Sequence, residues 1–299
     1  MENSVEARTT ILVLTSNHCA ELLDTLGLIC KLPERWPIIV VDNGSSDGTA
    51  AAVALHFPDV LLICAGHNLG AAARNIGVAY VHTPYIAFCD DDTHWEPGAL
   101  NRAVHLLDAA PDVAVLSACV KVGAQRETDP VCVSMGHSPL AREHLPGPQL
   151  LGFMASACVM RTRAFYDVGG YWPPFFLGGE EVLMALDLAE RGWRMVYADD
   201  VVIRHFPASR LDSRQMQHRL IRNAIWVAWM RRPLRAAWRE TYFQLAQARQ
   251  TDMFGWLMLQ VLWGLPRALR QRRVISPAIE AMRDLLDHAS IPPFVGSAR

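Results

Sequence analysis

Three consecutive carboxylates follow an apolar segment in the first half of the chain. Asp90, Asp91 and Asp92 come directly after YIAFC, and in an extended strand Asp90 and Asp92 project to the same side. Two like charges about 4 Å apart repel by roughly 4 kcal/mol at an intermediate effective dielectric. Because no Lys or Arg lies between residues 74 and 102, a local salt bridge is excluded. A divalent cation, which takes oxygen ligands, would offset the repulsion; the alternative is a solvated turn that faces the next helix.

A second acidic pair, Glu180 and Glu181, precedes a segment with helical spacing. Gly178 and Gly179 interrupt the chain before it, so both acids are expected in the first helical turn. There the helix dipole favours the ionised carboxylate, which keeps it ready to accept a proton. A carboxylate close to a hydroxyl group can act as a general base. The alternative is that both acids only serve the start of the helix.

The elements that must position these acids alternate between strand-like and helix-like segments. Continuous apolar strands separated by helices predict an α/β domain with a mainly parallel sheet that is covered on both faces. Ligands bind beyond the carboxyl ends of such strands, so the polar residues after each strand should meet at one edge. The segment 121–149 is predicted to be a long loop or lid. The predicted strands are Thr9–Leu14, Ile38–Val41, Val60–Cys64, Tyr85–Cys89 and Val113–Leu116, and the predicted helices span roughly residues 20–32, 47–57, 70–82 and 97–109.

Composition indicates a globular protein with reduced cysteines. Apolar residues make up 51% of the 299 residues and charged residues 19%, which excludes a disordered chain and allows a large core. The seven cysteines are scattered singly, without a CxxC pair, and most lie in apolar runs such as VLLIC, which ends at Cys64. No signal peptide precedes them. We therefore expect a cytoplasmic protein whose cysteines are reduced core residues.

Charge divides the chain into two regions. Residues 1–213 carry a net charge of −11, whereas residues 214–299 carry 14 Arg, five Trp and a net charge of +9. We expect these two regions to be separate domains with different functions. The second region should be helical, and either lies on the inner face of an anionic membrane or packs on the first region or a second subunit of a homo-oligomer. Its apolar run of 13 residues is too short to cross a bilayer, and no nucleic-acid-binding motif is present.

Four motifs, taken together, resemble the family 2 glycosyltransferases with the GT-A fold, over about residues 9–210. They are IIVVDNGSSDGT, GHNLGAAARNIG, CDDDT and GGEEV, the last followed by VVIRH. The resemblance implies that residues 1–213 are a catalytic domain, with a donor half near 9–120 and an acceptor half near 150–210. It implies transfer of a sugar from a nucleotide diphosphate donor, with UDP and dTDP favoured, to an acceptor hydroxyl with inversion. It also implies a divalent metal, Mn²⁺ or Mg²⁺. The acceptor is left open between a glycan, a lipid-linked glycan and a small molecule.

The resemblance assigns donor-binding roles to residues that follow the first three strands. Asp42 would read the base through a ring N–H, or would only cap the next helix. Thr15 and Asn17 would line the same pocket. Arg74 would grip the diphosphate through charge-assisted hydrogen bonds, or would only pair with an acid on a helix surface.

The remaining family positions fall on the acidic motifs. The resemblance assigns Asp90 to the ribose or the metal shell and Asp92 to the metal, whereas Asp91 would contribute through water. His205, at the end of VVIRH, would be a further metal ligand, or a structural histidine.

In GGEEV, the resemblance assigns the base position to Glu181, and Glu180 would cap the helix or bind an acceptor hydroxyl. Leu183 stands where relatives often carry another acid, which predicts a different acceptor.

Three other classes of protein would place different requirements on this sequence. A sugar nucleotidyltransferase needs a glycine-rich basic loop after the first strand, and LTSNHCAE has neither glycine nor Lys or Arg. A dinucleotide-binding oxidoreductase needs GxGxxG at the same place, which is also absent. A non-catalytic nucleotide-sugar-binding scaffold would not need the acids at 92 and 181.

Overall fold

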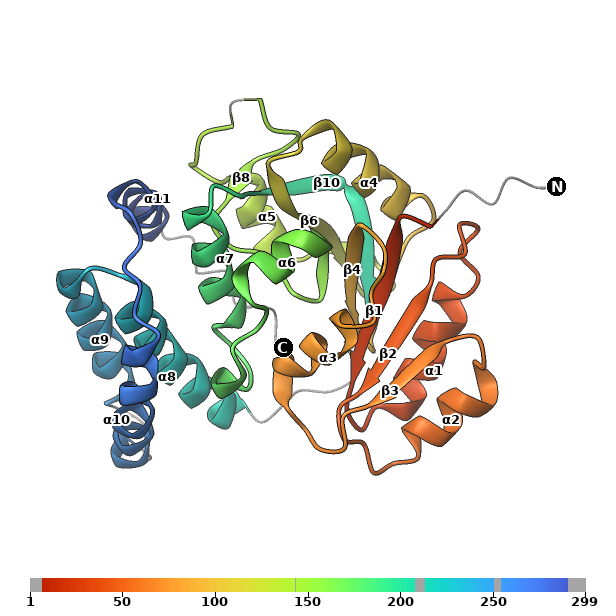
Figure 1. Cartoon of the computed structure of the whole chain (residues 1–299), viewed down its shortest axis with the longest axis horizontal. Helices are drawn as coiled ribbons and strands as arrows, with labels where there is room; N and C mark the ends of the chain where they lie inside the picture. Colours follow the sequence, from red (N-terminus) through yellow and green to blue (C-terminus); the bar gives the residue numbers. More distant parts are fainter. Residues whose placement is uncertain (1–6, 143, 208–212, 250–253, 290–299) are drawn as a thin grey trace.

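One large sheet forms the centre of the computed structural model, which describes residues 7–142, 144–207, 213–249 and 254–289 (Figure 1). The strand order β3-β2-β1-β4-β9-β6-β10-β5 places β1 between β2 and β4, and all three neighbouring pairs in this part of the sheet are parallel. The predicted strands are confirmed, four of them to within one residue at each end, whereas the fifth continues six residues beyond its predicted end at Leu116. Their bounds are β1 Thr9–Thr15, β2 Ile38–Asp42, β3 Leu61–Cys64, β4 Tyr85–Asp90 and β6 Val113–Val122.

The helices of the first half also follow the prediction, with one exception. They are α1 Cys19–Ile29, α2 Thr49–His56 and α4 Ala99–Ala109. The predicted helix 70–82 is shorter, because it begins as the 3₁₀ turn η1 Gly70–Ala72 and continues as α3 Ala73–Val78. Gly70 has a φ of +63°, and a Cβ there would lie 1.9 Å from the carbonyl oxygen of Phe176. This close approach sets the conformation of the turn.

The predicted α/β architecture is confirmed, and its sheet is mixed, with antiparallel strands inserted beside the parallel ones. The strand β9 (Ala157–Arg161) lies antiparallel between β4 and β6, and β5 (Thr93–Trp95) lies antiparallel to β10 (Arg194–His205). All of these strands are largely buried, and burial on both faces removes the alternation that distinguishes the two directions. The register pairs His205 with Thr93, which brings the end of β10 beside the acidic triplet.

The segment 121–149 is not a long loop. The strand β6 continues to Val122 and pairs with β7 (Glu127–Thr128), and β8 (Gln149–Leu150) pairs with β10. Between β7 and β8 lies the short helix α5 (Pro130–Gly136), whose N-cap Asp129 accepts a hydrogen bond from the amide of Val131 at 2.8 Å. Elements this short carry too few residues to produce a periodic pattern.

The C-terminal helices pack on the second half of the catalytic region (Figure 1). The guanidinium of Arg231 donates to Asp187 on α7 at 2.8 Å, and the indole of Trp226 lies in the main core beside Trp172 and Phe175. The described part of residues 214–299 therefore packs on the first region of the chain, which is one of the arrangements predicted from the charge pattern. The elements involved are α6 Thr162–Val168, η2 Pro173–Phe175, α7 Glu180–Glu190, α8 Ser213–Arg231, α9 Leu234–Ala248, α10 Phe254–Arg270 and α11 Pro277–His288.

The helices and the cysteines of the described residues bear on two further expectations. Among them, no helix combines the length and the apolar character that crossing a membrane requires. All seven cysteines are free, and Cys89, Cys119, Cys132 and Cys158 are buried as expected. Cys64 and Cys30 are exposed, since β3 is the edge strand and α1 ends at the surface.

Candidate active site

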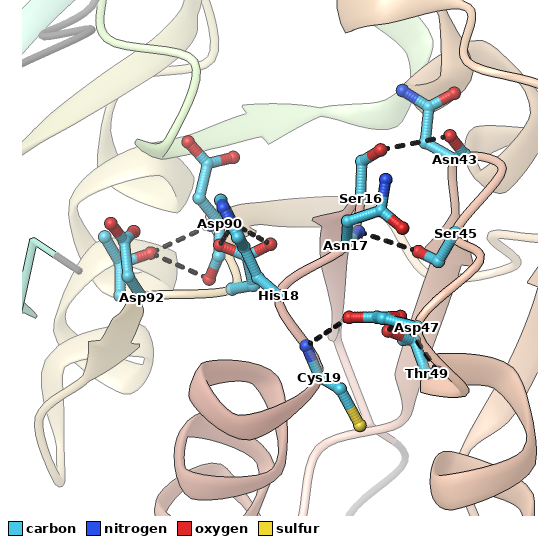
Figure 2. Close-up of polar contacts among 12 residues, drawn as sticks. Ser16, Asn17, His18, Cys19, Asn43, Ser45, Asp47, Thr49, Asp90 and Asp92 are labelled. Carbon is cyan, nitrogen blue, oxygen red and sulfur yellow. Dashed lines mark hydrogen bonds and ion pairs between the residues drawn. The ribbon is translucent and has the colours of Figure 1, made fainter. Parts of the chain in front are cut away.

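The loops after β1 and β2 are joined by hydrogen bonds at the carboxyl edge of the sheet (Figure 2). The side-chain oxygen of Asn17 accepts from the amide of Ser46 at 2.7 Å, and the amide of Asn17 donates to the hydroxyl of Ser45 at 2.9 Å. Asn17 has a φ of +58°, a left-handed conformation that Asn tolerates better than most residues. Asp42 is buried at the end of β2, and one of its oxygens accepts from the amide of Ser45 at 2.9 Å.

A cleft of about 520 Å³ opens between these loops and the second half of the chain. Donor-half residues form one wall, the loop before α7 contributes Phe176 and Leu177, and α8 contributes Arg219. Its predicted residues are Thr15, Asn17, Arg74, Asp90 and Asp91, and it is also lined by Ser16, His18, Asn43, Asn68, Gly70 and Gln215.

Asp90 has a cationic partner, which corrects the exclusion of a local salt bridge. The guanidinium of Arg74, on α3, pairs with the Asp90 carboxylate. Burial raises the pKa of Asp90, and the Arg74 charge opposes this shift without cancelling it. Arg74 is buried, and its Nε has no hydrogen-bond partner among the described residues. The guanidinium therefore neutralises an acid of the site, and only a small part of its surface is exposed to the cleft.

Asp91 and Asp92 each face a histidine. The Asp91 carboxylate lies 3.2 Å from Nδ1 of His18, and burial together with the neighbouring Asp90 charge raises the pKa of Asp91 to about 6. The Asp92 carboxylate lies 3.2 Å from Nε2 of His205. Burial works to lower the pKa of His205, but the hydrogen bond and charge of Asp92 outweigh it and raise this pKa.

The predicted metal ligands are only partly brought together. Asp92 and His205 are in contact, and a carboxylate beside an imidazole suits Mn²⁺. The third predicted ligand, Asp90, is engaged by Arg74. Within the described ranges, no group of three or more His, Cys, Asp or Glu side chains is arranged to hold a metal ion.

Glu180 and Glu181 are both 4% exposed at the start of α7. Burial raises the pKa of Glu180 well above its usual range, and the Glu181 charge adds to this. Burial also raises the pKa of Glu181 to about 7, although the Ala155 amide donates to it at 3.4 Å. Desolvation therefore outweighs the helix dipole that was expected to favour the ionised form, and both pKa values rise.

The two glycines that precede Glu180 and Glu181 end the loop and also allow α8 to pack closely against it. Gly178 and Gly179 have φ values of +84° and +92°, and a Cβ on Gly178 would lie 2.4 Å from the Leu220 side chain. Asn223 on α8 is fully buried and donates to the carbonyls of Phe175 and Leu177, both at 3.1 Å. The first turn of α7 is thus held by α8.

The two halves of the site are also joined directly, at a contact in the cleft lining and at a second contact outside it. The amide of Ala71 donates to the carbonyl of Phe176 at 2.7 Å. The side chain of Asn75 exchanges two hydrogen bonds with the backbone of Tyr171, at 2.8 and 2.9 Å. We refer to these contacts as the cross-cleft clamp.

Four residues of the site were given no role from the sequence. His18, Asn43, Arg219 and Asn223 contact the acids, line the cleft or hold its loops. His18 and Asn43 follow predicted strands and belong to the polar residues that were expected to meet at the edge of the sheet. Arg219 and Asn223 lie in the region set apart by its charge, and nothing local in the sequence connects them to the site.

This arrangement defines the class of the protein. A Rossmann-like donor half with an acidic strand end at a cleft, followed later in the chain by a buried acidic helix start, has the features of a GT-A nucleotide-sugar transferase. Residues 10–169 match the family model described as glycosyl transferase family 2, and the chain belongs to that family. It is therefore a nucleotide-sugar glycosyltransferase.

Relatives and solved structures agree with this assignment. The chain is 27% identical over 263 residues to the N-acetylglucosaminyl-diphospho-decaprenol L-rhamnosyltransferase of Mycobacterium tuberculosis, covering 73% of this chain and 84% of the relative. The mannosyltransferase PcManGT from Pyrobaculum calidifontis, solved with GDP-Man and Mn²⁺, superposes with a TM-score of 0.56 at 18% identity and covers 96% of this chain and 87% of its own. S. aureus TarS 1–349 in complex with UDP-GlcNAc gives 0.60 at 15% identity, with 92% and 83% covered. These structures show the shared fold.

Proposed function

We propose that this chain transfers a sugar from a nucleoside diphosphate donor to an acceptor hydroxyl by a single displacement with inversion, and that Glu181 is the general base. The burial of Glu181 carries the proposal. A carboxylate with a pKa near 7 is a stronger base than an ordinary glutamate and is still largely ionised just above neutral pH. Arg74 and Asp90, which line the donor cleft, both act on the pKa of Glu181.

Donor binding would use the loops after the first two strands. Asp42 would accept the ring N–H of uracil or thymine through its second oxygen, since the first accepts from Ser45. Thr15 and Asn17 would shape the pocket, and Asp90 and Asp91 would face the sugar and ribose.

We assign the main contact with the diphosphate to Arg219 rather than to Arg74. Arg219 lines the cleft, where its guanidinium lies 4.7 Å from the centre of the Phe176 ring. Burial and the neighbouring Arg219 charge lower the pKa of Arg222 to about 10, which reflects a concentration of positive charge at this end of α8. Such a cationic wall favours a dianionic donor group.

We place the divalent ion of the proposed reaction beside the end of β4. Asp92 and His205 would hold it, with Asp90 completing the set if its contact with Arg74 is given up. When bound, the ion would supply positive charge for the departing diphosphate. The Mn²⁺ present in the structure of the mannosyltransferase supports this assignment.

A lipid-linked glycan is the acceptor that the relatives favour. The mycobacterial relative is named for a decaprenol-diphosphate-linked substrate, and this chain spans most of its length. The acceptor side differs at one position from the usual family pattern, because the buried Leu183 stands in place of an acid. The hydroxyl recognised is therefore expected to differ from that of relatives with the acid.

Donor hydrolysis tests the proposal without knowledge of the acceptor. Purified protein with Mn²⁺ should slowly release nucleoside diphosphate from one donor among UDP-, dTDP- and GDP-sugars. Asp92→Asn should abolish the Mn²⁺-dependent release, whereas Asp200→Asn, an exposed acid paired with Arg102, should behave as the wild type. Release of nucleoside triphosphate on addition of pyrophosphate would instead identify a nucleotidyltransferase. Unchanged Mn²⁺-dependent release by Asp92→Asn would contradict the metal assignment.

A further inference from the structure

The helix α10 presents an apolar face to solvent. Trp256, Leu259, Leu262 and Trp263 are 55%, 61%, 56% and 91% exposed, and helical spacing places them on one side. This is more exposed apolar surface than scattered single residues produce. Residues on the other side, Leu257, Val261 and Ala268, are buried.

The α10 helix cannot turn this face inward. The indole of Trp226 on α8 donates to the carbonyl of Val261 at 3.0 Å. Gly264 lies so close to the same indole that a Cβ would be 2.0 Å from the ring. Leu257 and Val261 also share a small core with Ile221 and Ile225 of α8. The inner side of α10 is therefore fixed by its packing on α8. Because the helix cannot rotate, its outer side remains exposed.

Charge on this helix has one sign. The sequence 254–270 contains no Asp or Glu, and the exposed Arg267 and Arg270 lie in its last turn. Arg273, just beyond the helix, is also exposed. A face with exposed tryptophans, leucines and only basic side chains is typical of helices that lie in the headgroup region of a bilayer.

We propose that the outer face of α10 binds the surface of a bilayer that contains anionic lipid, with the helix parallel to the membrane plane. The exposed tryptophans and leucines would enter the boundary between headgroups and acyl chains, and the arginines would meet lipid phosphates. A second copy of the chain is a poorer occupant, since the same face offers no acid to the arginines. The inference goes beyond the proposed transferase chemistry and does not depend on it.

Flotation of the full-length protein with vesicles tests the proposal. The protein should float with vesicles of equal parts phosphatidylcholine and phosphatidylglycerol, and rising NaCl should release it. The double variant Trp256→Glu, Trp263→Glu should lower the ratio of bound to free protein by about tenfold or more, because it removes apolar area and adds repulsion. Tyr80→Glu, at a 51% exposed aromatic of the catalytic domain, is the matched control and should float as the wild type.

Two outcomes would overturn the proposal. One is recovery of the wild-type protein in the unbound fraction with both anionic and pure phosphatidylcholine vesicles. The other is a dimer, detected by sedimentation velocity, that the double variant dissociates while vesicle binding is absent. Equal thermal unfolding of the variants and the wild type shows that the substitutions act at the surface. Donor hydrolysis measured without vesicles reports separately on the transferase proposal.

Discussion

The active site and the outer face of α10 handle charge in opposite ways. At the site, a few charged groups are buried together, so Arg74 and Asp90 shift each other's pKa and both act on the pKa of Glu181. On α10 the arginines stand in water beside exposed apolar side chains. Buried charges interact strongly and are little affected by salt, whereas exposed ones act weakly and are screened. Single substitutions should therefore have large effects at the site and small, salt-dependent ones on the helices.

The largest effect is expected at the proposed base. Glu181→Gln should lower turnover by roughly 100-fold or more, because the amide keeps the size of the side chain and removes its basicity. Donor affinity, measured by calorimetry, should hardly change.

The pH dependence of turnover gives a second measure of the same residue. Turnover by the wild type should rise with pH through about 7, where Glu181 loses its proton. A flat profile over this range, or a product that retains the anomeric configuration of the donor, would rule out this mechanism. Near-normal turnover in Glu181→Gln with an inactive Glu180→Gln would move the base to Glu180.

A smaller effect is expected at the border between the two regions. Arg219→Gln should raise the KM for the donor by about tenfold, the scale of one charge-assisted contact with the diphosphate, and change kcat little. Arg235→Gln, on the exposed side of α9, removes an equal charge far from the cleft lining and should leave KM unchanged. An equal rise in KM for both variants would mean that only the general positive field matters.

The smallest effect concerns stability and the burial of Glu180. Its pKa is higher in the folded chain than in the unfolded chain, so the folded state holds the proton more tightly and loses stability as pH rises. Glu180→Gln cannot ionise and should be about 1 kcal/mol more stable than the wild type at about pH 8, with little gain at about pH 5. Thermal unfolding at several pH values measures this difference. The same difference at both pH values would show that folding does not raise the pKa of Glu180.

The sequence predicted the donor half of the fold better than the rest. Strands β1 to β4 are continuous apolar runs, and their ends were placed within one or two residues. Antiparallel insertion of β9 was missed because pairing partners are distant in the chain and leave no local pattern. The short elements between residues 121 and 149 were missed for lack of length, although Asp129 followed by Pro130 is a recognisable helix start.

The candidate site was predicted residue by residue, but its contacts were not. Arg74 and Asp90 were both predicted to belong to the site, but the ion pair between them was not. It joins a helix to a strand end 16 positions away, which no local pattern reports. Burial of Glu180 and Glu181 depends on α8, which the charge pattern had assigned to a separate region. Periodicity and motifs therefore identify which side chains matter, whereas their ionisation follows from tertiary packing.

The cross-cleft clamp has a mechanical consequence. A motion that opened the cleft between the 70–76 turn and the 171–177 loop would have to break the Ala71–Phe176 and Asn75–Tyr171 hydrogen bonds together. Gly70 has no room for a side chain against Phe176, so the two segments are in close contact here. The donor side and the acceptor side are therefore expected to move together, and a displacement that a bound ligand imposes on one should be transmitted to the other.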